Sequence, residues 1–107
     1  MRNLEDIKRY IVKNLKPINP KKIILFGSFA YGNPHENSDL DLCIIKDSFS
    51  KKREIRREIR RRLEDIEIPM DVLVVDENYY ETHSDNNWIN TALYDVRHKG
   101  EVLYEKK

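Results

Sequence analysis

Cysteine is almost absent from this chain of 107 residues, which has only Cys43. One thiol excludes a disulfide within the chain. Cys43 lies inside an apolar run, so we expect it to be buried and to pack as a small hydrophobic residue. A sequence that makes no use of disulfides fits a reducing compartment, and we predict the cytoplasm.

Long apolar runs are also missing. No stretch approaches the roughly 18 apolar residues that a membrane-spanning helix needs. Residues 1–16 are charged throughout and have no uninterrupted apolar core, so we expect no secretory signal there. Both features predict a protein that works without a membrane.

An excess of charge of one sign is absent, since the net charge is +1 although 36% of the residues are charged. The chain therefore has no overall field that would attract it to nucleic acid or to a membrane. His35, His83 and His98 share no ligand spacing with each other or with Cys43, so a zinc site is not expected. The length predicts one domain, residues 1–107, with no room for a separate substrate-binding domain.

Two short apolar runs, residues 23–26 and 42–45, enclose the most informative part of the sequence. The second run is apolar on both faces and is therefore typical of a strand that is covered on both sides. Asp39 and Asp41 lie at its entry and point to the same face, because side chains alternate along a strand. Two adjacent carboxylates repel each other unless a cation lies between them. Mg²⁺ prefers such oxygen ligands, so this pair predicts a magnesium site.

The segment between the two runs predicts a phosphate-binding turn. Gly27 and Ser28 leave the first strand sharply, and residues 29–31 can form one helical turn that Gly32 ends. Backbone N–H groups of such a turn, with the serine hydroxyl, form a cradle for anions. Each feature alone is common, but Gly-Ser followed by ten residues and Asp-x-Asp between two strands is much more specific.

The stretch LFGSFAYGNPHENSDLDLCII resembles the signature of the DNA polymerase β-like nucleotidyltransferase superfamily, and the short chain is similar to its minimal nucleotidyltransferase (MNT) family. The resemblance implies that Gly27 and Ser28 hold the phosphates of a nucleotide. It also implies that Asp39 and Asp41 bind metal ions. Many members carry an arginine where Tyr31 stands, so this chain departs from the family pattern there.

A third aspartate, Asp71, stands at the start of an apolar run over residues 70–76. An isolated buried carboxylate is costly unless it is paired or bound to a metal ion. If Asp71 lies on a strand next to Asp39 and Asp41, the three carboxylates could share metal ions. The alternative is a solvated strand end. The family pattern implies that Asp71 completes a site for two Mg²⁺ ions and also acts as the general base.

The remaining elements follow from periodicity. Apolar spacing predicts helices over residues 4–15, 51–66 and 87–99, and β-branched runs predict strands over residues 70–76 and 102–104. Together with the family resemblance, this predicts an α/β fold with a small mixed sheet of three to four strands. Helices are expected mainly on one face of the sheet, as in the polymerase β-like nucleotidyltransferase core.

Loops and helix ends are predicted from local chemistry. Asn3 is expected to cap the first helix, and Gly100 to end the last one. Asp76 is expected to be a strand exit or a helix cap. Residues 33–38 are rich in turn formers and are expected to form a loop over the site. Residues 77–87 are polar and are expected to form a loop or a short helical turn.

The second predicted helix is strongly basic. Two interpretations stay open: a solvated face with ordinary ion pairs to Glu54 and Glu58, or contact with RNA or an acidic partner. No aromatic residue is interleaved, which disfavours a base-stacking surface. The basic residues are Lys51, Lys52, Arg53, Arg56, Arg57, Arg60, Arg61 and Arg62.

Three functions remain in competition. The resemblance favours a nucleotidyltransferase that moves AMP from ATP to a hydroxyl, often a tyrosine of a HEPN-type ribonuclease toxin for which the MNT protein is the antitoxin. A partner-binding module without catalysis is the second, and an antibiotic-modifying nucleotidyltransferase is the third. The partners expected are a nucleoside triphosphate and a HEPN-type toxin encoded nearby, with a homo-oligomer as a further possibility.

Overall fold

The computed structural model describes residues 3–31, 38–48, 51–85 and 91–106. The elements in chain order are α1 (Leu4–Leu15), η1 (Lys16–Ile18), β1 (Lys22–Phe26), α2 (Ser28–Tyr31), β2 (Leu40–Lys46), α3 (Lys52–Arg62), β3 (Met70–Asp76), α4 (Glu77–His83), α5 (Ala92–Lys99) and β4 (Glu101–Glu105).

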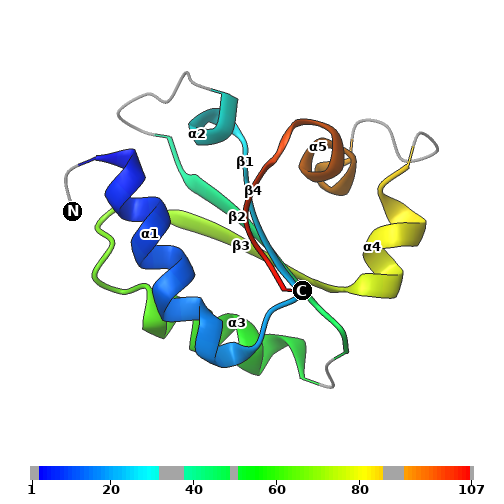
Figure 1. Ribbon diagram of the computed structural model, residues 1–107, viewed down its shortest axis with the longest axis horizontal. Coiled ribbons are helices and arrows are strands. Elements are labelled where there is room, and N and C mark those ends of the chain that lie inside the picture. Colours follow the sequence, from blue (N-terminus) through cyan, green and yellow to red (C-terminus); the bar gives the residue numbers. More distant parts are fainter. Residues whose placement is uncertain (1–2, 32–37, 49–50, 86–90, 107) are drawn as a thin grey trace.

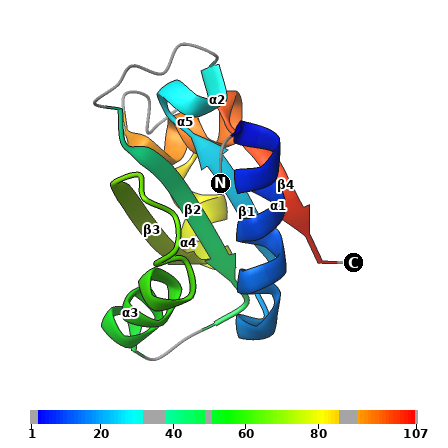
Figure 2. The same cartoon turned by 90° about the vertical axis from the view of Figure 1, so that its left-hand side faces the viewer.

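The four strands form one mixed sheet in the order β3-β2-β1-β4. β2 and β3 are parallel, whereas β1 pairs antiparallel with both β2 and β4. A parallel pair needs a crossover, and α3 provides it between β2 and β3. β3 and β4 lie at opposite edges of the sheet (Figure 2). The predicted α/β class with a mixed sheet is confirmed.

Helices cover both faces of the sheet (Figure 1). The longer helices α1 and α3 bury Ile11 and Ile59 in one apolar cluster with alternate residues of the strands. α4 and α5 bury Tyr80 and Val96 in a second cluster. The expectation of helices mainly on one face is too narrow, because β2 is apolar on both faces and both must be removed from water.

Cys43 belongs to the second cluster and is buried, as its place in the apolar run predicts. Burial raises the pKa of its thiol to about 12. The thiolate is the reactive form of cysteine, so this side chain serves packing and is chemically inert. In the described part of the chain, no helix is both long and apolar enough to cross a membrane.

The predicted helix ends are partly confirmed. Asn3 caps α1 by accepting a hydrogen bond from the backbone N–H of Asp6 at 2.9 Å. Asp76 caps α4, and Gly100 ends α5. The polar segment after β3 forms the short helix α4, which is one of its two predicted forms.

Two helices are shorter than predicted. α3 ends at Arg62. Leu63 and Ile66 lie in the turns that follow the helix, and these turns keep both side chains buried in the core. α5 begins at Ala92, because Thr91 has an extended backbone and caps it through its hydroxyl. The predicted helical residues 87–90 lie outside the described residues, as do residues 33–37 of the predicted loop.

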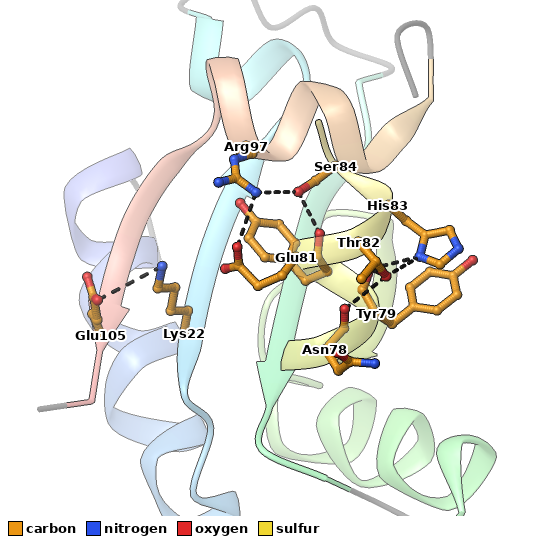
Figure 3. A network of polar contacts seen from close by, with 10 residues as sticks. Lys22, Asn78, Tyr79, Glu81, Thr82, His83, Ser84, Arg97 and Glu105 are labelled. Carbon is orange, nitrogen blue, oxygen red and sulfur yellow. Dashed lines mark hydrogen bonds and ion pairs between the residues drawn. The ribbon is translucent and has the colours of Figure 1, made fainter. Parts of the chain in front are cut away.

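A polar clamp joins α4 to α5 (Figure 3). Ser84 is fully buried and donates a hydrogen bond to the backbone carbonyl of Tyr80. Arg97 of α5 donates to the Ser84 hydroxyl at 3.0 Å and forms an ion pair with Glu81 at 3.3 Å. A buried hydroxyl needs such partners, so Arg97 holds together the layer that covers the second face of the sheet.

Replacing Arg97 by alanine should lower the free energy of unfolding by about 1 kcal/mol, because the buried Ser84 hydroxyl loses one partner. Urea denaturation followed by circular dichroism measures the change. Arg9→Ala is the control, since Arg9 pairs with Asp6 at an exposed site and should cost ~0.5 kcal/mol or less. Equal losses in the two variants would refute a structural role for the clamp.

Candidate functional site

Two of the three predicted aspartates lie side by side on neighbouring strands. Asp41 of β2 and Asp71 of β3 are direct partners in the parallel register. Leu40 and Leu42 pack in the cluster of α1 and α3, so the Asp41 side chain between them belongs to the opposite face, with Cys43. The pairing therefore places both carboxylates on the face that α4 and α5 cover further along the strands.

Asp39 directly precedes β2 and shares the face of Asp41 by alternation. Asp39 and Asp71 are exposed, whereas Asp41 is half-buried. The exposure of Asp71 removes the argument that its burial would be costly, because a solvated carboxylate carries no such penalty. Its register opposite Asp41 is what places it at the site.

The electrostatics of the site centre on Asp41. Burial raises the pKa of its carboxyl, and the nearby charges of Asp71 and Asp39 raise it further. The charges of Asp39 and Asp71 therefore disfavour the charged form of Asp41, in the direction that like-charge repulsion predicts.

The turn after β1 packs directly against this carboxyl. Gly27 has a φ of +76°, and a Cβ atom added to it would lie 2.1 Å from Oδ2 of Asp41. Phe26 is the register partner of Asp41, so the next residue passes close to its side chain. The Gly27 carbonyl accepts hydrogen bonds from the N–H groups of Ala30 and Tyr31, which begin the predicted helical turn. Only glycine combines this backbone with this approach.

The sequence-predicted residues thus meet at one end of the sheet. Gly27 touches Asp41, Ser28 is the first residue of α2, and Asp71 lies beside Asp41. No three His, Cys, Asp or Glu side chains within the described ranges are gathered into a ready-formed metal site. The donors nevertheless fit a hard cation by their chemistry, since they are carboxylate oxygens under mutual repulsion, and Mg²⁺ completes its shell with water and phosphate oxygens.

Lys99 is a candidate that the sequence did not indicate. Its Nζ atom lies 6.0 Å from the centre of the Tyr31 ring, which is 42% exposed at the end of α2. Figures 1 and 2 both place α2 and α5 at the same end of the sheet. The ammonium of Lys99 therefore lies next to the predicted phosphate turn. No local pattern shows this, because Lys99 and Tyr31 are distant in the chain and α5 lies near α2 through its packing on β1.

The larger surface grooves lie elsewhere. One of about 570 Å³ runs between α1 and β4, and another of about 400 Å³ lies beside α3. A smaller pocket of about 250 Å³ opens on the aspartate face of β3, where Leu73 and Val75 line it together with Tyr79 of α4. Leu73 is two residues from Asp71, so this apolar pocket begins beside the carboxylates.

Comparisons with known proteins bear on the family and the fold of the chain. The family described as "Polymerase beta, Nucleotidyltransferase" matches residues 5–107. No curated protein matches the chain significantly.

Several solved structures share the fold. A toxin–antitoxin with AMP-PNP is 23% identical with a TM-score of 0.66, covering 94% of this chain and 74% of that chain. A mutant of the toxin–antitoxin MntA-HpeT has the same TM-score and coverage at 21% identity. A complex of the tri-AMPylated Shewanella oneidensis HEPN toxin with an MNT antitoxin is 19% identical, with a TM-score of 0.61, covering 95% of this chain and 72% of that chain. At these identities the likeness concerns the fold.

The raised pKa of Asp41 predicts a pH-dependent effect of Asp41→Asn. The folded protein holds the Asp41 proton more tightly than the unfolded chain, so stability falls as the pH rises from the unfolded value of 3.8 through the folded one. At pH 7 in a chelating buffer the variant should therefore be more stable than the wild type. The difference should vanish as the pH approaches 3.8.

Urea unfolding across this pH range measures the effect. Glu64→Gln is the control, because Glu64 is exposed and follows α3 on the other side of the sheet. A variant at Asp41 that is no more stable than the wild type at pH 7 would contradict a cost of its charge from burial and like-charge repulsion.

Proposed function

Since the chain belongs to the polymerase beta nucleotidyltransferase family, we propose that it transfers a nucleoside monophosphate, AMP from ATP, to a hydroxyl acceptor. We propose further that the acceptor is a tyrosine of a HEPN-type ribonuclease toxin and that the chain acts as its antitoxin. Structures with this fold support the choice, because they include a tri-AMPylated HEPN toxin with an MNT antitoxin and a toxin–antitoxin with AMP-PNP.

The observation that carries the proposal is the environment of Asp41. Its carboxyl lies against Gly27 of the turn and beside Asp71 of the next strand. A phosphate bound by the backbone of that turn would thus lie next to the carboxylates. Phosphoryl transfer depends mainly on positioning and on stabilising charge, and this arrangement serves both needs.

Each residue has a definite task in the proposed reaction. Gly27 and Ser28 hold the triphosphate, and Asp39, Asp41 and Asp71 hold Mg²⁺. When bound, two Mg²⁺ ions supply positive charge that lowers the pKa of the acceptor hydroxyl and balances the phosphates.

The exposed Asp71 carboxylate takes the hydroxyl proton as general base. The acceptor oxygen then forms its bond to the α-phosphorus, the bond from that phosphorus to the bridging oxygen breaks, and pyrophosphate leaves.

The acceptor must come from another chain. The carboxylates of Asp39 and Asp71 are exposed, so this end of the sheet admits a partner. The apolar pocket that Leu73 and Val75 line begins beside Asp71 and can receive the ring of a tyrosine. A HEPN-type toxin supplies this tyrosine and closes the site, and a second copy of the chain can add a further wall.

Lys99 is the residue we assign to the triphosphate in place of the arginine that many relatives carry where Tyr31 stands. Its ammonium lies over the Tyr31 ring at the end of α2. A cation there attracts phosphate oxygens, although exposure to water limits the gain.

Asp41→Asn should abolish AMP transfer while the fold and the contact with the toxin persist, because one metal-binding charge is lost and the shape is kept. The toxin encoded beside this chain is co-purified with the tagged protein and incubated with ATP and Mg²⁺. Intact-mass measurement should show added AMP units with the wild type and none with Asp41→Asn.

The mass measurement together with a cell-protection assay separates catalysis from neutralisation by contact. If Asp41→Asn leaves the toxin unmodified but still protects cells as well as the wild type does, the antitoxin acts by binding alone. An unmodified toxin in the presence of the wild-type protein would refute the proposed reaction.

Lys99→Gln should raise the KM for ATP about tenfold with little change in kcat, which corresponds to ~1.4 kcal/mol of lost binding. Lys99→Arg should restore most of the affinity, because it keeps the charge. Lys13→Gln removes an exposed cation from α1 and is the matched control. Steady-state kinetics of AMP transfer measure all three, and equal KM values in Lys99→Gln and Lys13→Gln would argue against the assignment.

A further inference from the structure

Four exposed arginines of α3 form a row that we call the arginine ridge: Arg53, Arg56, Arg57 and Arg60. No ion pair involves any of them among the residues that the structure describes. The two glutamates of α3 form ion pairs with other basic residues. Glu58 pairs with Arg61 and Arg62, and Glu54 pairs with Lys51.

Helix geometry places the ridge on one side of α3. The spacings of three, four and seven residues put its members within a sector of about 100°, along about 10 Å of the helix. Ile55 and Ile59 lie on the opposite, inward side, where Ile59 is fully buried in the core under the sheet. The ridge is therefore a compact row of cations directed at solvent.

Folding gives little reason for this arrangement. Like charges three and four residues apart on a helix each cost a few tenths of a kcal/mol. Arg53 also lies in the first turn of α3, where the helix dipole disfavours a cation. Only the basic residues of the last turn, Arg60 to Arg62, benefit from the dipole. A costly row of charge that the fold does not require indicates a ligand.

The ridge is separate from the aspartate site. The apolar side of α3 packs on the face of the sheet opposite to the one that carries Asp41 and Asp71. Lys52 at the start of α3 lines the pocket beside Leu73, but none of the four ridge arginines does. α2 and α3 also lie at opposite ends of the sheet in Figures 1 and 2. A molecule bound on the ridge therefore leaves the nucleotide turn free.

We propose that the arginine ridge binds the phosphate backbone of a nucleic acid without reading its bases. Guanidinium groups match phosphate oxygens by paired hydrogen bonds, and the spacing of the ridge presents several to one backbone. No aromatic residue of α3 offers a stacking surface for bases.

An acidic protein is the less suitable partner. Protein interfaces have an apolar or aromatic centre, but the exposed large apolar side chains of the described residues are Tyr31, Tyr79 and Val102, all outside α3. A phosphate backbone needs no such centre. The net charge of +1 also gives no general attraction to a polyanion, so binding depends on this local cluster.

Fluorescence polarisation tests the proposal with labelled oligo-uridylate RNA and oligo-thymidylate DNA of about 20 nucleotides, which exceeds the footprint of a small binding surface. The affinity of the wild type should fall as the salt concentration rises. In Arg56→Gln/Arg57→Gln the affinity should fall, and the slope of log affinity against log salt should become shallower by about 1.4, or ~0.7 for each lost single-strand contact. Comparison of the two oligonucleotides shows whether the sugar matters.

Lys13→Gln/Lys16→Gln is the matched control, because it removes two exposed charges, one from α1 and one from η1, and should keep the wild-type slope. Asp41→Asn should bind as the wild type does, which separates the ridge from the proposed transfer reaction. Glutamine has a helix propensity close to that of arginine, so the ridge variant should keep its circular dichroism spectrum.

Three results would overturn the proposal. The first is no binding of either oligonucleotide at low salt. The second is an equal loss of affinity in Lys13→Gln/Lys16→Gln, which would mean that only net charge matters. The third is tighter binding of a labelled polyglutamate of similar length, which would identify an acidic protein as the partner instead.

Discussion

The parallel pairing of β2 with β3 is the interaction on which the rest of the structure depends. It sets Asp41 beside Asp71 and, by alternation, sends their neighbours into the two apolar clusters. A shift of one residue would move every side chain of a strand to the other face. Such a shift would move Leu42 and Ile44 out of the cluster of α1 and α3 and would turn the Asp41 carboxyl toward that buried cluster. The core therefore holds the carboxylates in register.

Charge repulsion at the site is balanced by packing elsewhere. Asp41 is half-buried against Gly27 and next to two other carboxylates, which is unfavourable for its charged form. The free energy gained by burying the two apolar clusters offsets this unfavourable charge. The Arg97–Ser84 hydrogen bond adds to the stability of one of these layers. A cation bound between these carboxylates would remove their repulsion, which is the physical reason for the metal in the proposed reaction.

Two charged regions of the chain thus differ in kind. The aspartates gather by tertiary pairing at one end of the sheet, whereas the arginine ridge arises from the periodicity of a single helix. They lie on opposite faces, so the proposed reaction and the proposed nucleic-acid binding can be changed independently.

Local chemistry made much of this protein predictable from its sequence. The cap at Asn3, the strand over residues 70–76, the turn at Gly27 and the burial of Cys43 could all be predicted from neighbours a few residues away. The motif of Gly-Ser and Asp-x-Asp also identified the family, which the match over residues 5–107 confirms.

Tertiary structure alone decided the rest. It placed helices on both faces of the sheet, exposed Asp71, joined Arg97 to Ser84 and brought Lys99 to Tyr31. Each of these features depends on segments that are distant in the chain and meet only when the sheet is assembled. A pattern of neighbouring residues carries no record of which distant surface will cover it.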